Sequence, residues 1–205
     1  MTPSPRFTLP ARLLHWSMAV LILAMLLIGV AMVTSLADYH ALVSLHRPLG
    51  ILILVLALLR LANRWRHAPP PLPADLPLWQ RRAAHASHVA LYGLMLAMPL
   101  VGWAMLSAAR YPVALAGPLV LPPILPQSPM LYAGLRSVHT VLAYSLFGLI
   151  LAHLGAALLH ALIRQDGVFS SMAPWRPSRP APTLQPEGPT GARPSRSPTE
   201  QQARK

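Results

Sequence analysis

The chain has 205 residues, of which 54% are apolar and only 11% are charged, and its mean hydropathy is +0.47. Soluble domains carry charge on about a quarter of their residues, so this composition excludes an ordinary water-soluble enzyme and favours a membrane protein. The chain contains no cysteine, which excludes disulfides, thiolate-held iron–sulfur clusters and haem attached through a C-x-x-C-H sequence. Any metal ion must therefore be bound by His, Met or carboxylate side chains.

The chain is strongly basic, with 17 Lys and Arg residues against five Asp and Glu and a net charge of +12. Such an excess is one signature of nucleic-acid binding. Here, however, the basic residues lie at the edges of apolar stretches and in the region after residue 175, which is typical of membrane topology signals. We therefore expect the basic residues to contact the lipid bilayer, and we expect no binding of nucleic acid.

Four apolar segments are each long enough to cross a bilayer. The first is about twice as long as the apolar core of a secretory signal peptide, so we expect it to be retained as a membrane span. The sequence therefore predicts an all-α membrane protein built as a four-helix transmembrane bundle. The segments cover approximately residues 13–34, 46–64, 85–107 and 139–163.

The distribution of basic residues predicts the orientation of the bundle. Apart from Arg47, Arg110 and Arg136, every Lys and Arg lies on the side that holds both termini and the link between the second and third spans. The positive-inside rule then places both termini in the cytoplasm, and an even number of spans agrees with that placement. We expect a multi-pass protein of the bacterial inner (plasma) membrane.

Proline-rich stretches mark the links and the end of the membrane domain. The inner link, residues 68–77, is expected to be a semi-rigid polyproline segment. The outer link, residues 108–136, is apolar but non-helical, and it forms either a lid over the bundle or a flexible loop. Pro48 is expected in the first turn of the second span. Residues 1–175 are predicted to form the membrane domain, and residues 176–205 a disordered basic tail held lightly to anionic lipid.

Histidines lie at matching depths in the predicted spans. His15 begins the first span on the inner side, and His46 begins the second on the outer side. His139 begins the fourth span, and His153 follows 14 residues later on nearly the same helix face, about 21 Å along the axis. Matching by depth pairs His46 with His139 and His15 with His153. Two axial imidazoles from facing helices are what a low-spin haem iron requires, so the sequence predicts two stacked haem sites. Small residues that would open planar slots there include Gly29, Gly50, Ser145, Gly148, Ala152 and Gly155.

Other interpretations of these histidines stay open. A single histidine in a membrane often serves as a hydrogen-bond donor between helices. His85 and His88 form an i, i+3 pair at the inner end, where zinc binding is one possibility and hydrogen bonding or support of the inner site is the favoured one. A histidine-based metal transporter or scaffold without haem is a further alternative, and it predicts that the purified protein has no Soret band.

Sequence motifs around the histidines resemble those of the bacterial cytochrome b561 proteins, which are four-helix di-haem membrane cytochromes. The resemblance covers residues from about 6 to 175. It implies two haem b groups, an inner one held by His15 and His153 and an outer one held by His46 and His139. The matching segments are RLLHW, SLHRPLGI, AHASHVALYGLMLAMPLVGW, SVHTVLAY and LAHLGAALLHALI.

The resemblance also implies electron transfer between the outer face and the quinone pool, and specifically the oxidation of superoxide with reduction of ubiquinone. Arg47, Arg110 and Arg136 on the outer side are suited to steering a small anion inward. The same arginines would equally serve to end helices or to pair with lipid phosphate. Fold-level resemblance leaves another donor at the outer face open.

His160 is the candidate proton donor on the quinone side. It lies seven residues beyond His153, on roughly the same helix face, with Arg164 nearby. Plain hydrogen bonding at the membrane interface is the alternative role of this side chain. The alternative function for the whole chain is that of a cytochrome b subunit, which relays electrons between a redox partner protein and quinone in a larger dehydrogenase or hydrogenase.

Overall fold

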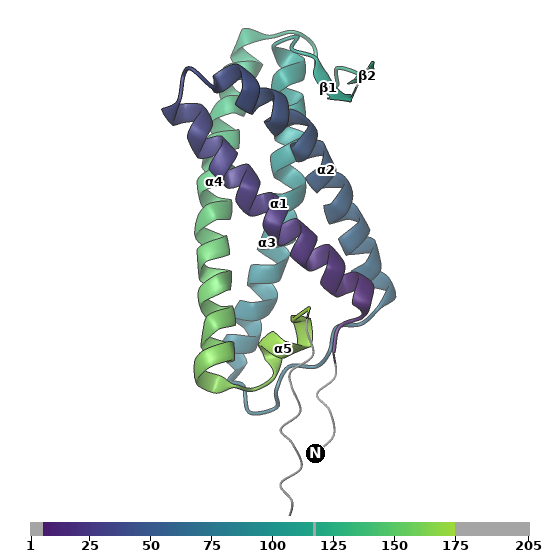
Figure 1. The fold of residues 1–205 in the computed structure, drawn as a ribbon, viewed down its shortest axis with the longest axis vertical. Helices are drawn as coiled ribbons and strands as arrows, with labels where there is room; N and C mark the ends of the chain where they lie inside the picture. Colours follow the sequence, from purple (N-terminus) through teal and green to yellow (C-terminus); the bar gives the residue numbers. More distant parts are fainter. Residues whose placement is uncertain (1–5, 117, 175–205) are drawn as a thin grey trace, which may run out of the picture. The chain divides into compact units, whose positions relative to one another are not determined.

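The structure is a computed structural model that describes residues 6–116 and 118–174. Four long helices run along the bundle (Figure 1), and each is long and apolar enough to cross a membrane. The predicted four-helix transmembrane bundle is therefore confirmed. The prediction of a disordered tail over residues 176–205 lies outside the described residues. The four helices are α1 (Leu9–Thr34), α2 (Tyr39–Arg66), α3 (Leu78–Ala108) and α4 (Pro129–Leu158).

Capping residues set the beginnings of two helices, and these lie beyond the apolar segments of the sequence. The Thr8 hydroxyl accepts a hydrogen bond from the Ala11 N–H at 3.4 Å at the start of α1. Ser128 likewise accepts from the Leu131 N–H at 3.3 Å at the start of α4. Each helix also has a proline in its first turn, where the missing N–H costs nothing.

The prediction that Pro48 lies in the first turn of the second helix was wrong. α2 begins at Tyr39, nine residues earlier, so Pro48 lies inside the helix. The link from α1 is short, covering only residues 35–38, and residues 39–47 contain no residue that would stop a helix. The interior proline removes one backbone hydrogen bond from α2, and the helix continues past it.

The outer link is ordered as a hairpin. It contains two short antiparallel strands, β1 (Val113–Ala116) and β2 (Leu119–Leu121), and β1 packs against α2. The indole nitrogen of Trp103 in α3 donates a hydrogen bond to the Pro122 carbonyl at 3.0 Å. These strands were not predicted from the sequence. A non-helical, apolar link was correctly expected, but its predicted end at residue 136 was wrong, because α4 begins at Pro129 and residues 129–136 are helical.

Residues in the left-handed backbone region end two of the helical segments. Arg110 follows α3 with φ of 59°, and Gln165 follows with φ of 49° after a π-helical turn, η1 (Leu159–Arg164), that continues α4. The chain then folds back into α5 (Val168–Met172). The Trp16 indole donates a hydrogen bond to the Met172 carbonyl at 3.0 Å, so α5 ties the end of α4 to the start of α1.

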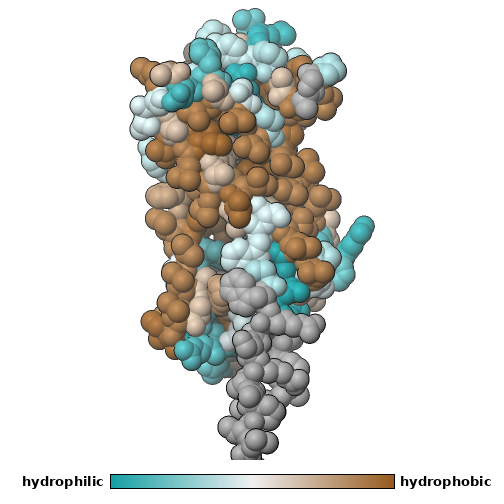
Figure 2. Space-filling model, in the orientation of Figure 1, coloured by the Kyte–Doolittle hydropathy of each residue, from teal (hydrophilic) through white to brown (hydrophobic). Residues whose placement is uncertain are grey.

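The surface of the bundle is apolar across its middle, with hydrophilic residues gathered at both ends (Figure 2). Large side chains such as Leu27 and Val33 are 72% and 81% exposed. In water this much apolar exposure would be strongly unfavourable, whereas lipid tails provide a matching solvent. The buried interior is a small cluster near the middle of the helices, made of Met18, Ile22, Ile53, Ala57, Met95 and Leu146.

Candidate functional site

The residues that face the centre of the bundle repeat every seven positions along each helix. Seven residues are about two turns, or 10.5 Å, so such residues lie on one stripe of a helix. Taken across the four helices, the stripes form three layers, which we name the His46 tier, the middle tier and the His15 tier. The His46 tier contains Gly29, His46, Gly102 and His139, the middle tier Ile22, Ile53, Met95 and Leu146, and the His15 tier His15, Arg60, His88 and His153.

The middle tier is a packed apolar layer, because its four residues belong to the one buried cluster of the bundle. The two polar tiers lie on either side of it. On α4 the two histidines are 14 residues apart, which corresponds to about 21 Å of rise. The arrangement therefore provides two separate sites along the bundle, divided by aliphatic side chains.

In the His46 tier, His46 and His139 face each other with ring centroids 6.2 Å apart and an interplanar angle of 64°. Gly102 allows His139 to lie close to α3, because a Cβ at this position would lie 3.3 Å from Cε1 of the ring. The Nδ1 atom of His46 is buried and has no hydrogen-bond partner in the described part of the chain. A buried imidazole nitrogen without a partner is costly, and a ligand in this tier would remove that cost.

In the His15 tier, His15 and His153 have ring centroids 6.3 Å apart and an interplanar angle of 72°. His88 of α3 lies against the same His153 ring, with centroids 5.8 Å apart. The positive charge of Arg60 acts electrostatically on all three imidazoles. This tier is therefore much more polar than the His46 tier.

Each of the two histidine pairs fits the coordination of one haem iron. A metal–imidazole bond is about 2.0 Å and the ring centre lies about 1.2 Å beyond the nitrogen, so one iron between two imidazoles sets their centroids about 6.4 Å apart. The measured separations are 6.2 and 6.3 Å. Several of the glycines also have open space at the position of a missing Cβ, as a planar group would need. They are Gly29, Gly50, Gly148 and Gly155.

The other predicted histidine pair is not brought together. His88 turns toward His153, whereas His85 is exposed on the surface of α3. Across residues 6–116 and 118–174, no three His, Asp or Glu side chains form a site for a metal ion. The structure therefore gives His88 a place beside the pair His15 and His153, and gives His85 none.

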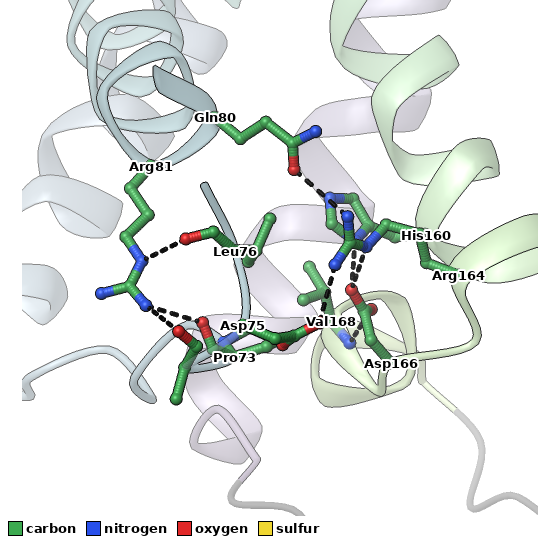
Figure 3. Close-up of polar contacts among 10 residues, drawn as sticks. Pro73, Asp75, Leu76, Gln80, Arg81, His160, Arg164, Asp166 and Val168 are labelled. Carbon is green, nitrogen blue, oxygen red and sulfur yellow. Dashed lines mark hydrogen bonds and ion pairs between the residues drawn. The ribbon is translucent and has the colours of Figure 1, made fainter. Parts of the chain in front are cut away.

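His160 belongs to a polar cluster at the end of the bundle that holds α5 (Figure 3). The Nδ1 atom of His160 donates to Oδ2 of Asp166 at 2.7 Å, and Nε of Arg164 donates to the same oxygen at 3.2 Å. Arg164 also reaches Asp75 at 2.9 Å and Gln80 at 3.4 Å. The cluster joins the end of α4 to the inner link and to the first turn of α3.

The charge state of Asp166 follows from these contacts. Burial alone would raise the pKa of this carboxyl group. Hydrogen bonds from His160, from the Val168 N–H and from Arg164 outweigh burial and hold the pKa of Asp166 below its ordinary value. Asp166 is therefore an ionised acceptor at neutral pH and fixes one nitrogen of the His160 ring.

The three arginines of the opposite end lie in different settings. Nη1 of Arg47 donates to the Pro112 carbonyl of the hairpin link at 3.3 Å. Arg110 lines a cavity of about 210 Å³ together with Trp103 and residues of the hairpin. Arg136 is exposed on α4. They surround the end of the bundle nearest the His46 tier.

The sequence analysis missed two features of the site. Arg60 lies 14 residues after His46, the same spacing that separates His139 from His153, so this spacing was a signal that would have placed Arg60 in the His15 tier. Asp166 was not predicted to be part of the site. Its contact with His160 depends on the π-helical turn and on the left-handed Gln165, for which the sequence offers no clear signal.

Comparison with known proteins agrees with this architecture. Residues 6–175 match the family described as prokaryotic cytochrome b561. Cytochrome b561 homolog 2 of Escherichia coli (strain K12) is 33% identical over 162 residues, which are 77% of this chain and 86% of that protein. Cytochrome b561 homolog 1 of the same organism is 34% identical over 64% of this chain and 74% of its own length. The "Probable superoxide oxidase CybB" of Yersinia pestis is 32% identical over 63% of this chain and 73% of its own length.

The family match covers all four spanning helices and both histidine pairs. The chain therefore belongs to the prokaryotic cytochrome b561 family, and it is a haem b-binding membrane protein of electron transfer.

Proposed function

We propose that this protein is a di-haem cytochrome that oxidises superoxide at one membrane face and reduces ubiquinone at the other. The observation that carries the proposal is the presence of two facing histidine pairs, 6.2 and 6.3 Å apart, on either side of an apolar layer. His46 and His139 would hold one haem b, and His15 and His153 the other. When bound, haem iron supplies a one-electron ferric–ferrous couple.

The charge distribution supports an orientation with both termini in the cytoplasm of a bacterial inner membrane. At the end of the bundle with α5, the described residues include eight arginines, whereas the hairpin end has three. By the positive-inside rule, the end with α5 faces the cytoplasm and the His46 tier lies toward the outer face. Reporter fusions at the two termini and at the hairpin would test this orientation directly.

Two features of the outer end and the name of one relative support superoxide as the donor. Superoxide is a small anion, and Arg47, Arg110 and Arg136 give this end a positive field that would steer it inward. The cavity beside Arg110 offers a recess of suitable size for a small molecule. A relative from Yersinia pestis also carries a name that describes it as a superoxide oxidase. Each superoxide gives up one electron and leaves as dioxygen.

The opposite end supplies a residue suited to the quinone reaction. Ubiquinone takes up two electrons and two protons to form ubiquinol, so two superoxide ions are consumed for each quinone. Nδ1–H of His160 donates to Asp166 at 2.7 Å, so a proton for the quinone would come from Nε2–H of the doubly protonated ring. We infer that His160 donates a proton to the quinone and is recharged from the cytoplasm.

The experiment mixes the purified, detergent-solubilised protein anaerobically with potassium superoxide and follows the haem α band, with and without ubiquinone. We expect rapid reduction that superoxide dismutase prevents and that ubiquinone reverses. Haem that stays oxidised would overturn the superoxide assignment in favour of a relay subunit, which should co-purify with a soluble redox partner. Protein that has no Soret band after haem-replete expression would overturn the haem sites themselves.

A second experiment uses a variant to test the quinone side alone. His160→Ala should keep both haem spectra and the rate of reduction by superoxide, while reoxidation by ubiquinone slows by about a hundredfold or more, as expected for the loss of a general acid. His85→Ala is the matched control, because His85 is an exposed histidine at the same end of the bundle. Unchanged quinone kinetics in His160→Ala would remove His160 from the reaction.

A further inference from the structure

Arg60 is the one residue of the His15 tier that is not a histidine. It is half-buried and directed inward, since Nε donates to the Tyr92 hydroxyl of α3 at 3.0 Å and Nη1 donates to the Ala11 carbonyl of α1 at 3.4 Å. Ala11 lies one turn from His15, so the guanidinium lies beside the histidine pair. A charged group inside a membrane segment is costly, and such groups commonly mark functional sites.

Arg64 lies one turn further along α2 and doubles this charge. The guanidinium carbons of Arg60 and Arg64 lie 5.9 and 5.8 Å from the centre of the Tyr92 ring. Such cation–π contacts fix the position of both groups. Within the described residues, Arg64 makes no hydrogen bond and neither arginine has an acidic partner, since the ion pairs there involve only Arg164 and His160.

The two arginines line a cavity of about 50 Å³ that also contacts Asn63 and Thr8. No Asp or Glu is among the described residues that line it. A cavity of this size exceeds the 10–15 Å³ that one water molecule needs. Arg6 also lines this cavity, so three arginines surround an open space near the end of the membrane bundle and form a binding site for an anion.

We propose that Arg60 and Arg64 bind the carboxylate side chains of the haem at the His15 tier, and this inference rests on the proposed haem site. Haem b carries two carboxylates on one edge of its ring, and both need compensation in a medium of low dielectric constant. The positive charge of Arg60 already acts on the imidazoles of His15 and His153. The same cations would favour the reduced iron, because reduction removes one positive charge.

The first test uses the unaltered full-length chain, expressed without haem and then loaded with either haem b or its dimethyl ester. The ester keeps the iron and the ring but has no carboxylate charge. We expect the His15 tier to bind the ester roughly ten- to hundredfold more weakly than haem b, as is typical when charged hydrogen bonds are lost. Arg47 acts electrostatically on His46, so the ester comparison is made within the His15 tier, between the unaltered chain and its arginine variants.

The second test substitutes the two arginines. Arg60→Gln and Arg64→Gln should each lower the midpoint potential of the haem in the His15 tier, Arg60→Gln more strongly. The double variant should lose most of the discrimination between haem b and the ester. Arg66→Gln is the matched control, because Arg66 is an exposed arginine at the end of the same helix and does not line the cavity. This variant should leave unchanged both the midpoint potential of the haem in the His15 tier and the preference for haem b over the ester.

The outcomes separate this inference from the proposed function. Equal binding of haem b and the ester by the unaltered chain would overturn the inference and leave the two haem sites intact. If, in addition, phosphatidylglycerol stabilised the protein and Arg64→Gln abolished that effect, the cavity would belong to a lipid phosphate. An unaltered chain that binds haem only in the His46 tier would overturn the proposed di-haem function as well.

Discussion

The two histidine tiers have the same pair of facing ligands but different surroundings. In the His46 tier, α1 and α3 contribute Gly29 and Gly102. In the His15 tier, seven-residue steps along α2 and α3 bring Arg60 and His88 to the same level. Besides the histidine pair, one tier is therefore lined by glycines, whereas the other is rich in hydrogen-bonding and charged groups.

This difference suits the two half-reactions that we propose. Oxidation of superoxide releases one electron and dioxygen and needs no proton from the protein, so its site has no need of titratable side chains beyond the ligands. Quinone reduction consumes two protons, and the His15 end of the bundle contains His160, which we propose as the proton donor and which Asp166 holds in place. The contrast between the tiers thus separates an electron-entry site from a site where electrons and protons meet.

The largest expected effect comes from removing one ligand from each tier. His139→Ala should abolish the haem of the His46 tier and His153→Ala that of the His15 tier, so the haem content per chain falls by about half in each variant. The pyridine haemochromogen assay measures this ratio, and a redox titration shows which potential is lost. His85→Ala should keep both haems. A variant of either ligand that retained full haem content would contradict the proposed pairing.

The next effect tests the close approach of α3 in the His46 tier. Gly102→Val places methyl groups where even a Cβ would already lie 3.3 Å from the His139 ring, so the ring must shift, at a cost of about 1–3 kcal/mol. We expect weaker haem binding at the His46 tier alone, visible as haem loss on dilution. Gly93→Val on the same helix is the control, because its Cβ would have no neighbour within 4 Å. Equal losses in both variants would mean that Gly102 has no special role.

The sequence predicted the features that depend on composition and on helical spacing. Four apolar stretches are enough to define four spans, and the 14-residue interval from His139 to His153 places both on one face of α4. The pairing of these two residues with His15 and His46 was predicted from depth in the membrane, which we estimated from the distance of each histidine to the ends of its span. The structure indeed brings these rings to 6.2 and 6.3 Å.

Features that depend on local backbone geometry were not predictable in the same way. The hairpin of β1 and β2 lies among prolines and has too few residues for a strand pattern to emerge. The start of α2 at Tyr39 was missed because Pro48 resembled a first-turn proline. The contact of His160 with Asp166 requires the chain to reverse at Gln165, a non-glycine residue in the left-handed region.

A smaller effect is expected from the third histidine of the His15 tier. The ring centroids of His88 and His153 are 5.8 Å apart, so His88 helps to position the His153 ring. We propose His15 as the ligand that faces His153. His88→Phe should therefore keep both haems and shift the potential of only the His15-tier haem, as replacement of a polar neighbour does. Potentiometric titration measures the shift. Complete loss of one haem would instead make His88 a ligand and replace His15 or His153 in the pairing.

The smallest effect concerns pH, and it should be confined to the His15 end. Hydrogen bonds to its ionised form hold the pKa of Asp166 in the folded protein below the ordinary value of 3.8, so its contribution to stability is fully present above that value. The contribution is lost as the pH falls through the lowered pKa, because protonation removes the acceptor that His160 and Arg164 use. Asp166→Asn should lower the melting temperature by about 2–4 °C near neutral pH. The difference from the unaltered chain should narrow as the pH falls below 3.8 and disappear below the lowered pKa. Asp75→Asn is the control, because the Asp75 side chain is 71% exposed and its ion pair with Arg164 contributes little. A gap between Asp166→Asn and the unaltered chain that stayed constant down to pH 3 would show that Asp166 acts by packing and that its charge is unimportant.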